Sequence, residues 1–290
     1  MNALLKRLLI FFIGIPAVVV LVLFLPFQKH LVLNIAVIIF SGIGAVEFSQ
    51  MLEKKQLYVS KIESFILGAL APAALTLNIC FNFPEWIIPL FIMTGACWAL
   101  LSQAFSRLEK METVTNHLAA CLSILIYPGF FLYWIVKMTA WENSGAILLF
   151  LFISFGSDSA AWLLGNLFGA NNRGIIAASP NKSIAGFIGG MAGSIIVSGA
   201  AAFLFPSVFP AHNEYANISG LLTAAILLGF ITGIAAALGD LAESAIKRSC
   251  GLKDSGNLMP GRGGILDSID SIAVASPVFY LLFNVLFINI

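Results

Sequence analysis

Long apolar segments separated by short polar ones run through the whole chain, and they constrain its fold more than any other feature. Windows of about 20 apolar residues are long enough for a helix to cross the hydrocarbon core of a bilayer. Lipid cannot satisfy backbone N–H and C=O groups, so spanning segments are helices or closed barrels, and these runs lack the alternation of barrel strands. The composition agrees, with 10% charged residues against about a quarter in soluble domains. The sequence predicts an all-α polytopic membrane protein.

We predict about nine transmembrane helices from these windows. The segment over 145–168 is interrupted by Ser154, Ser157 and Asp158. The apolar run after Lys6 and Arg7 is long and lacks a cleavage site of small residues, so we interpret it as an uncleaved first helix and not a signal peptide. The predicted helices lie near 8–26, 31–52, 64–82, 86–105, 117–136, 145–168, 184–205, 219–240 and 268–289.

The basic residues divide unevenly between the two sides of the predicted bundle. Only Lys29 and Lys137 fall on one side, and the other thirteen of the fifteen Lys and Arg residues fall on the opposite side. Because cytoplasmic loops carry the excess of basic residues, we expect a multi-pass protein of the cell's inner (plasma) membrane, with a cytoplasmic N-terminus and an outside C-terminus. The thirteen are Lys6, Arg7, Lys54, Lys55, Lys61, Arg107, Lys110, Arg173, Lys182, Lys247, Arg248, Lys253 and Arg262.

The cysteines and histidines are scattered along the chain. No two cysteines form a CxxC pair, and three of the four lie in or near apolar spans, so we interpret them as small apolar side chains and not as disulfides or metal ligands. No zinc cluster or histidine-based triad is predicted. These residues are Cys80, Cys97, Cys121, Cys250, His30, His117 and His212.

Aspartates and close-packing glycines are concentrated in the second half of the chain. Short carboxylates near one membrane face suit Mg²⁺ or another hard cation. Glycines recur every four residues in two predicted spans, a spacing that lets helices approach closely in lipid. We therefore divide the chain functionally at about residue 140, into a scaffold (1–140) and a half that carries the site (141–290). The residues are Asp158, Asp240, Asp254, Asp267 and Asp270, with Gly186, Gly190, Gly189, Gly193, Gly229 and Gly233.

Asp158 lies inside a predicted span. If that helix enters at Gly145 on the outer face, its rise of about 1.5 Å per residue places the carboxylate roughly 20 Å into the membrane. A charge there costs about 2.5 to 3.5 kcal/mol unless it meets water, a cation or a partner. We expect Asp158 to line a water-filled cavity that opens inward, and the alternative is a polar bend near the helix end.

The segment Ser179-Pro180-Asn181-Lys182-Ser183 precedes the next predicted helix. Its serines and asparagine are suited to capping that helix, and a helix N-terminus beside a lysine offers N–H donors and positive charge to a phosphate. The segment is not a Walker motif, because the glycine spacing is missing.

Two acidic helix ends flank a basic, glycine-rich loop. Asp240, Glu243, Ser244 and Lys247 share one face at the cytoplasmic end of the eighth predicted helix, and 267–271 forms a matching face at the start of the ninth. The loop glycines permit positive φ and close approach of the backbone to an anion. Two phosphate charges about 4 Å apart repel by about 4 kcal/mol at an effective dielectric of about 20, so cations must offset them. The arrangement predicts a site for a metal-bound polyphosphate.

Taken together, these motifs resemble the signature of the phosphatidate cytidylyltransferases, also called CDP-diacylglycerol synthases. The likeness in specific motifs covers about residues 155–275. The motifs are Asp158-Ser159-Ala160, Ser179-Pro180-x-Lys182-Ser183, Gly239-Asp240-Leu241-x-Glu243-Ser244, Lys247-Arg248, Lys253-Asp254-Ser255-Gly256, Pro260-Gly261-x-Gly263-Gly264 and Leu266-Asp267-x-Ile269-Asp270-Ser271.

The resemblance implies a transferase of phospholipid biosynthesis, in which the phosphate of phosphatidic acid attacks the α-phosphorus of CTP and gives CDP-diacylglycerol and pyrophosphate. It also implies Mg²⁺, in a two-cation centre, and a membrane-embedded homodimer, and we expect no nucleic acid partner. The implied metal ligands are Asp240 and Asp267, and the implied catalytic set is Asp240, Lys253, Asp254, Asp267 and Asp270. The implied substrate-binding residues are Asp158, Ser179, Lys182, Ser183, Glu243, Ser244, Lys247, Arg248, Ser255, Gly256, Arg262, Gly263 and Gly264.

The loop departs from the family pattern at two positions. Arg262 stands where the family usually has histidine, and Ser268 where it usually has arginine. Arginine stays protonated and cannot carry a proton, but attack by an ionised phosphate needs little proton transfer. We predict that Arg262 partly replaces the charge missing at Ser268, and that Arg262→His with Ser268→Arg raises turnover if both departures impair catalysis; unchanged turnover would reject that idea.

Two alternatives stay open. One is a relative that acts on another phosphorylated lipid or has lost its activity through the changes in the loop. The other is a membrane transporter, which the interrupted span over 145–168 would suit.

Overall fold

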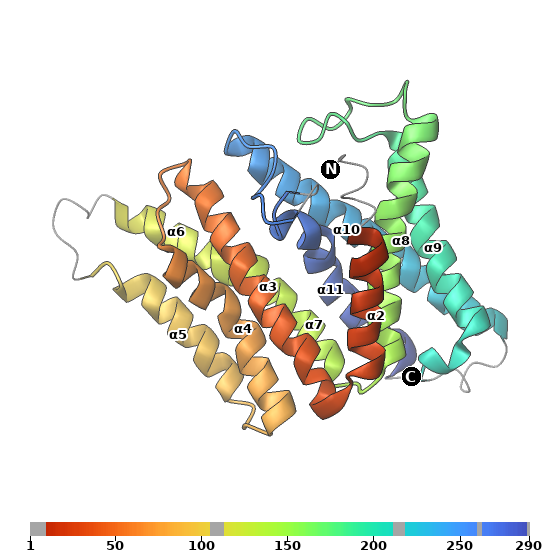
Figure 1. Ribbon diagram of the computed structural model, residues 1–290, viewed down its shortest axis with the longest axis horizontal. Helices are drawn as coiled ribbons and strands as arrows, with labels where there is room; N and C mark the ends of the chain where they lie inside the picture. Colours follow the sequence, from red (N-terminus) through yellow and green to blue (C-terminus); the bar gives the residue numbers. More distant parts are fainter. Residues whose placement is uncertain (1–9, 105–112, 211–217, 260–262, 289–290) are drawn as a thin grey trace. The chain divides into compact units, whose positions relative to one another are not determined.

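The computed structural model describes residues 10–104, 113–210, 218–259 and 263–288 (Figure 1). Within these ranges the regular structure is helical, and β-type pairing is limited to two isolated bridges, Arg173 with Ser183 and Met259 with Gly263. The predicted all-α class is confirmed. The α-helices are α2 (Ile15–Phe24), α3 (Phe27–Glu53), α4 (Lys61–Phe81), α5 (Ile87–Leu101), α6 (Val114–Ile124), α7 (Phe131–Thr139), α8 (Ser144–Phe168), α9 (Ile184–Leu204), α10 (Ile218–Ser249) and α11 (Leu266–Phe287).

In the described ranges, seven helical segments are long and apolar enough to cross a membrane, and each coincides with a predicted span. One of them, Val114–Thr139, comprises α6, α7 and the π-helical turn Leu125–Phe130 between them. Two further predicted spans coincide with shorter apolar helices, Phe12–Phe24 and Ile87–Leu101. The polytopic character of the chain is therefore confirmed, while the count of nine and the orientation of the termini stay predictions.

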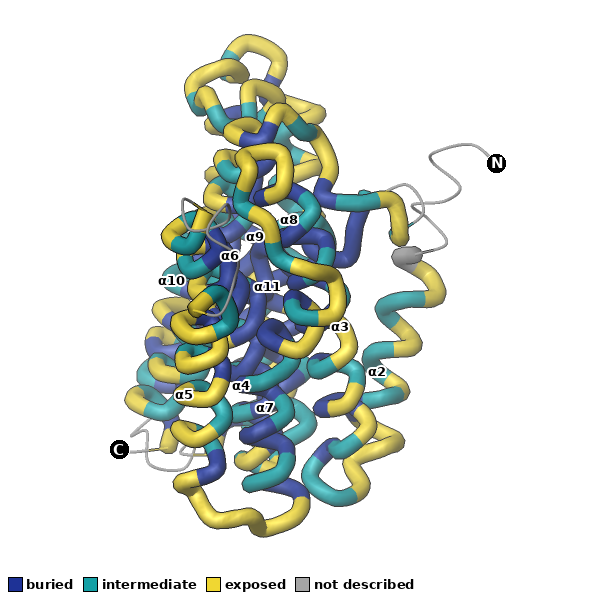
Figure 2. Tube along the Cα trace, turned by 90° about the vertical axis from the view of Figure 1, so that its left-hand side faces the viewer, coloured by how far each residue is buried: buried dark blue, intermediate teal, exposed yellow. Residues whose placement is uncertain are grey.

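Large apolar side chains are exposed along the helices, and in Figure 2 the helices change repeatedly between buried and exposed residues along their length. Trp162, Ile196 and Phe203 are 61%, 67% and 71% exposed. Water-soluble proteins rarely expose contiguous apolar surface of this kind, whereas lipid accepts it. Each helix therefore has one side that packs on its neighbours and one that suits contact with acyl chains.

The chain divides into two compact units. The first comprises residues 1–142 and 247–269, and the second comprises residues 143–246 and 270–290. The division falls within α10 and within α11, so each of these helices has residues in both units. The functional division predicted at residue 140 concerns catalysis and stays a prediction.

In the first unit, α3 and α4 pack through small residues. The Ser41 hydroxyl donates to the carbonyl oxygen of Gly68 at 2.7 Å, and a side chain on Gly68 would collide with Ala45. At the cytoplasmic end in the predicted topology, Ser60 caps α4 by accepting a hydrogen bond from Glu63 N at 3.3 Å. This packing fixes the positions of two acidic residues, Glu47 on α3 and Glu63 on α4.

In the second unit, the predicted glycine series is the contact surface between helices. A Cβ on Gly193 of α9 would lie 2.6 Å from the Cβ of Ala160 on α8, and one on Gly229 of α10 would lie 2.6 Å from the carbonyl oxygen of Ser194. The predicted role of these glycines in close packing is thereby confirmed. A Cβ on Gly239 would lie 2.6 Å from the carbonyl oxygen of Asp270, so α10 and α11 also approach closely beside their acidic residues.

Candidate active site

In the first unit, the loop between α10 and α11 folds around the carboxylate of Asp267. The Oδ2 atom accepts three hydrogen bonds, from Ser255 N at 2.8 Å, Ser255 Oγ at 2.9 Å and Gly264 N at 2.7 Å. The Oδ1 atom pairs with Lys247 Nζ at 2.5 Å, and the two side chains are 6% and 10% exposed. Two nearly buried charges thus offset each other, and the remaining acceptor capacity of the carboxylate is used by loop donors.

Glycine is required where the loop meets Asp267. Gly263 has a φ of +103°, a backbone conformation that side chains disfavour, and a Cβ there would collide with Asp267 Oδ2. The next amide, Gly264 N, then donates to that same oxygen. The loop therefore forms an anion-binding nest, as its glycines predict, and in this structure the nest holds a carboxylate of the chain itself.

Glu47 of α3 holds the same loop from the other side. Its Oε1 accepts from Ile265 N at 3.0 Å, and its Oε2 accepts from Leu266 N at 2.8 Å and from Ser255 Oγ at 3.2 Å. The residue is 6% exposed. Leu266 begins α11, so a buried carboxylate satisfies amides at the N-terminus of that helix, where negative charge is favourable.

Lysines and an aspartate line an open pocket of about 370 Å³ in the first unit. Gln50 and Met51 of α3 and Lys54 just after it form one wall, and residues 252–257 of the loop form the other. The predicted residues Lys253, Asp254, Ser255 and Gly256 belong to that second wall. The pocket combines positive charge with backbone groups, which suits a phosphorylated ligand.

In the second unit, four acidic residues gather from three helices. Asp270 of α11 interacts electrostatically with Asp240 and Glu243 of α10 and with Asp158 of α8. Asp158 Oδ2 accepts from Ser271 Oγ at 3.2 Å, which brings α8 into the group. Glu243 is 1% exposed and Asp270 is 7% exposed.

Lys182 belongs to the same group. Lys182 Nζ lies 2.5 Å from Asp240 Oδ2, and Ser244 Oγ donates to Asp240 Oδ1 at 3.4 Å. Ionised carboxylates that lie close together repel one another. A hard divalent cation relieves the same repulsion, and carboxylate oxygens are the ligands that Mg²⁺ takes in proteins. These carboxylates are of the ligand type that Mg²⁺ takes, and a Mg²⁺ site among them stays a prediction.

With this geometry established, comparison with known proteins decides the family. A model described as the cytidylyltransferase family matches residues 5–286, nearly the whole chain. The chain belongs to the cytidylyltransferase family. The resemblance that the motifs indicate is therefore confirmed.

Curated members of the cytidylyltransferase family match at similar identity over most of their length. The phosphatidate cytidylyltransferase of Thermotoga maritima is 29% identical over 275 residues, which is 94% of each chain. That of Staphylococcus epidermidis is 30% identical over 272 residues, covering 92% of this chain and 96% of the relative. That of Synechocystis sp. is 30% identical over 276 residues, covering 85% of each.

Of the site residues predicted for this cytidylyltransferase family member, most fall into the two groups. Asp158, Lys182, Asp240, Glu243, Ser244 and Asp270 come together in the second unit. Lys247, Lys253, Asp254, Ser255, Gly256, Gly263, Gly264 and Asp267 surround the loop of the first. The two predicted metal ligands, Asp240 and Asp267, thus belong to different groups, and their joint role stays a prediction.

The remaining predicted residues shape the backbone or lie elsewhere. Ser183 caps α9 by accepting from Gly186 N at 3.0 Å, as predicted for this segment, and the carbonyl of Ser179 accepts from Lys182 N at 3.0 Å. Arg248 donates to the carbonyl oxygen of Leu252 at 3.1 Å. Arg262 lies outside the described residues.

Sequence reasoning missed Glu47 and Lys54, which belong to the half interpreted as scaffold. Glu47 is an acidic residue inside the predicted span 31–52, near its end. A charge in such a position is costly and normally functional, so the same argument that singled out Asp158 could have found it. Lys54 had no comparable signal, because basic residues are common at the ends of spans.

Proposed function

We propose that this chain converts CTP and phosphatidic acid to CDP-diacylglycerol and pyrophosphate. A phosphate oxygen of phosphatidic acid attacks the α-phosphorus of CTP, the bond to the bridging oxygen of the β-phosphate breaks, and pyrophosphate leaves with the electron pair. Membership of the cytidylyltransferase family supports this reaction, as do the names of the relatives. The observation that carries the proposal is the group of four carboxylates beside Lys182, of which Glu243 and Asp270 are buried. Membrane helices keep such a group when it binds a cation or substrate.

The two groups of residues suggest separate tasks. In the second unit, Asp158, Asp240, Glu243 and Asp270 would hold Mg²⁺, which when bound neutralises the triphosphate and stabilises the leaving pyrophosphate. Lys182 would exchange its pairing with Asp240 for a phosphate oxygen. In the first unit, Lys54 and Lys253 would bind phosphates in the pocket that they line, while Glu47 and Asp267 keep the loop in place.

We also propose the two-cation centre, the homodimer and the binding partners that the sequence led us to expect. Asp240 and Asp267 would each contribute a ligand in a two-cation centre; Asp267 would do so by exchanging Lys247 for the cation at its Oδ1 atom. The protein would be a homodimer in the plasma membrane. Its site would face the cytoplasm, an orientation that the excess of basic residues in the loops on that side supports. CTP, phosphatidic acid and membrane lipid would be its partners.

The decisive experiment measures pyrophosphate release by the purified protein in mixed micelles. We expect release to require CTP, phosphatidic acid and Mg²⁺ together. Asp240→Asn and Asp267→Asn should each lower turnover roughly a hundredfold or more, because each removes charge that acts on the transition state. Glu53→Gln is the matched control, since Glu53 is an exposed acidic residue at the end of α3.

Thermal unfolding of each variant shows whether it is folded. Full activity of folded Asp240→Asn would contradict its role in cation binding. Release that depends on another phosphorylated lipid, such as lysophosphatidic acid or a polyprenyl phosphate, and not on phosphatidic acid would overturn the proposed substrate while leaving the nucleotidyl transfer intact.

A further inference from the structure

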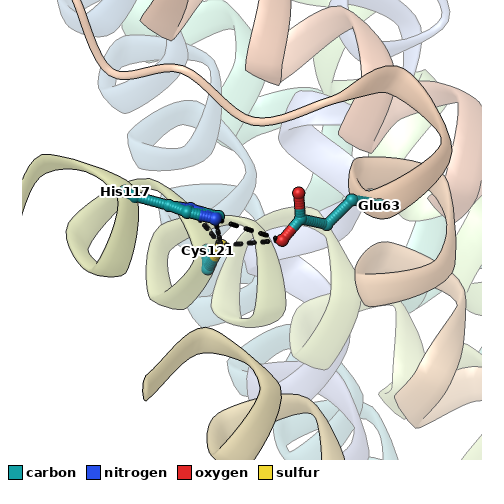
Figure 3. Close-up of side chains that lie close together, drawn as sticks. All are labelled: Glu63, His117 and Cys121. Carbon is teal, nitrogen blue, oxygen red and sulfur yellow. Dashed lines mark hydrogen bonds and ion pairs between the residues drawn. The ribbon is translucent and has the colours of Figure 1, made fainter. Parts of the chain in front are cut away.

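Three potential metal ligands that are distant in sequence meet in the first unit, among residues for which the proposed reaction has no use. Glu63 comes from the first turn of α4, and His117 and Cys121 come from α6, one helical turn apart. Figure 3 shows the imidazole and the thiol on the same side of α6, facing the carboxylate. Their potential ligand atoms all lie within 4.8 Å of one another.

The distances between these atoms match those of a tetrahedral metal site. Zinc binds carboxylate oxygen, imidazole nitrogen and thiolate sulfur at about 2.0 to 2.3 Å, which at tetrahedral angles separates the ligand atoms by about 3.3 to 3.6 Å. In the structure, Glu63 Oε1 lies 3.2 Å from His117 Nε2 and 3.8 Å from Cys121 Sγ, and Sγ lies 3.8 Å from Nε2. Adjustments of a few tenths of an ångström would close the site.

The immediate surroundings also resemble those of a metal site. Trp98 Nε1 donates to Glu63 Oε1 at 2.7 Å, and hydrogen bonds of this kind orient ligating carboxylates. Ser102 Oγ lies 3.4 Å from His117 Nε2, at the spacing of a fourth ligand or of a hydroxyl that holds a bound water. The group is shielded yet reachable, since His117 is 6% exposed and Cys121 is 0% exposed, while the Glu63 side chain is 16% exposed.

The chemistry of the three ligands selects the metal. Thiolate and imidazole ligands favour Zn²⁺ and similar transition metals over Mg²⁺, which takes oxygen ligands. Metal binding would place a dication beside the partly exposed carboxylate of Glu63 and join the first turn of α4 to α6. We propose that Glu63, His117 and Cys121 bind one Zn²⁺ ion, at a site distinct from the carboxylate group assigned to Mg²⁺.

Cobalt provides a direct test, because Co²⁺ bound by a thiolate gives a near-ultraviolet charge-transfer band that an oxygen-only site does not. The full chain, with any affinity tag removed, is freed of metal with a chelator and titrated with Co²⁺ in excess Mg²⁺. We expect one equivalent to bind with the thiolate band and the visible bands of tetrahedral Co²⁺, and one equivalent of Zn²⁺ to displace it. X-ray absorption of the zinc-loaded wild-type chain should show one sulfur ligand.

Matched variants locate the site. Cys121→Ser should abolish the thiolate band, whereas Cys97→Ser, at an exposed cysteine on α5, should leave it unchanged. Trp98→Phe should weaken Zn²⁺ binding on the order of tenfold to a hundredfold. The proposal is overturned if the wild-type chain binds no stoichiometric Zn²⁺ or Co²⁺, if its zinc has no sulfur ligand, or if folded Cys121→Ser keeps the band.

Discussion

Glu47 connects an apolar helix to the loop that carries seven of the eighteen predicted site residues. Both of its oxygens accept hydrogen bonds from the segment 255–266, and the glycines at 256 and 264 leave room for its carboxylate, since a Cβ at Gly256 would lie 2.6 Å from Oε1. The geometry of the loop therefore depends on a residue that no substrate needs to touch.

We expect Glu47→Gln to destabilise the protein by about 1.5 to 3 kcal/mol, because an amide group would then face a backbone N–H donor in place of a charged acceptor. Pyrophosphate release should fall as the loop loses its fixed position. Thermal unfolding and the turnover assay measure the two effects, with Glu53→Gln as the exposed control. Equal stability of the two variants would show that the buried carboxylate does not fix the loop.

A substitution of Lys54 tests whether the pocket beside the loop binds the nucleotide. Lys54 lines it, and its neighbour Lys55 is also exposed but is not among the lining residues. We expect Lys54→Ala to raise the KM for CTP about fivefold, which corresponds to about 1 kcal/mol for a partly solvated charge pair. Lys55→Ala should leave the KM unchanged, and an equal effect of both changes would mean that only general surface charge attracts the nucleotide.

At the scale of the helices, the close contact of α8 with α9 depends on glycines at the positions where the two backbones meet. Gly156, Gly189 and Gly193 let the two backbones approach, and a Cβ on Gly193 would lie 2.7 Å from the carbonyl oxygen of Gly156. Backbone atoms cannot turn away as a flexible side chain can, so a methyl group here must separate the helices. That separation would move Asp158, which α8 contributes to the carboxylate group.

We predict that Gly193→Ala destabilises the protein by about 1 to 3 kcal/mol through overpacking. Gly199→Ala on the same helix is the control, because its Cβ would make only ordinary contacts of 3.6 and 3.7 Å and alanine favours helix. Thermal unfolding in one detergent compares them directly. A neutral Gly193→Ala would mean that α8 and α9 tolerate a wider spacing.

The sequence predicted the long helices well, but it did not predict which side chains of different helices meet. All seven long apolar helices of the described ranges coincide with predicted spans, because lipid imposes the same length and composition on each. From the sequence, Cys121 is interpreted as a small apolar side chain and His117 as one of the scattered histidines, although a spacing of four residues places both on one face of a helix. The third member of their group, Glu63, comes from α4, and a single sequence contains no signal for that pairing.

For the whole molecule, the distribution of basic residues predicts which loops face the cytoplasm. Tyr58 lies in the loop after α3, which carries Lys54 and Lys55, and Glu142 lies in the loop after α7. In a Cys97→Ser background, we expect Tyr58→Cys to react with an impermeant maleimide in inside-out vesicles only, and Glu142→Cys in right-side-out vesicles only. The reverse pattern would invert the predicted topology.

Sequence motifs predicted which residues belong to the candidate site far better than they predicted which of these residues contact one another. The spacing of Asp240, Glu243 and Asp270 predicted two acidic helix faces, and the structure brings these side chains together in the second unit. The hydrogen bonds from Ser255 and Gly264 to Asp267 could not be predicted, since they depend on how the loop turns back. The pairing of that loop with Glu47 could not be predicted either, since it joins opposite ends of the chain.

That last pairing bears on how the protein is made. Glu47 enters the membrane early in synthesis, whereas its partners Ile265 and Leu266 follow 218 and 219 residues later. If helices are inserted in the order of synthesis, Glu47 enters the bilayer before these two partners exist. Until α11 is made, its side chain must be protonated or shielded by the insertion machinery. Chains truncated before residue 265 would lack the backbone donors that Ile265 and Leu266 provide to Glu47. The unsatisfied acidic side chain would be a feature by which cellular quality control could recognise incomplete chains.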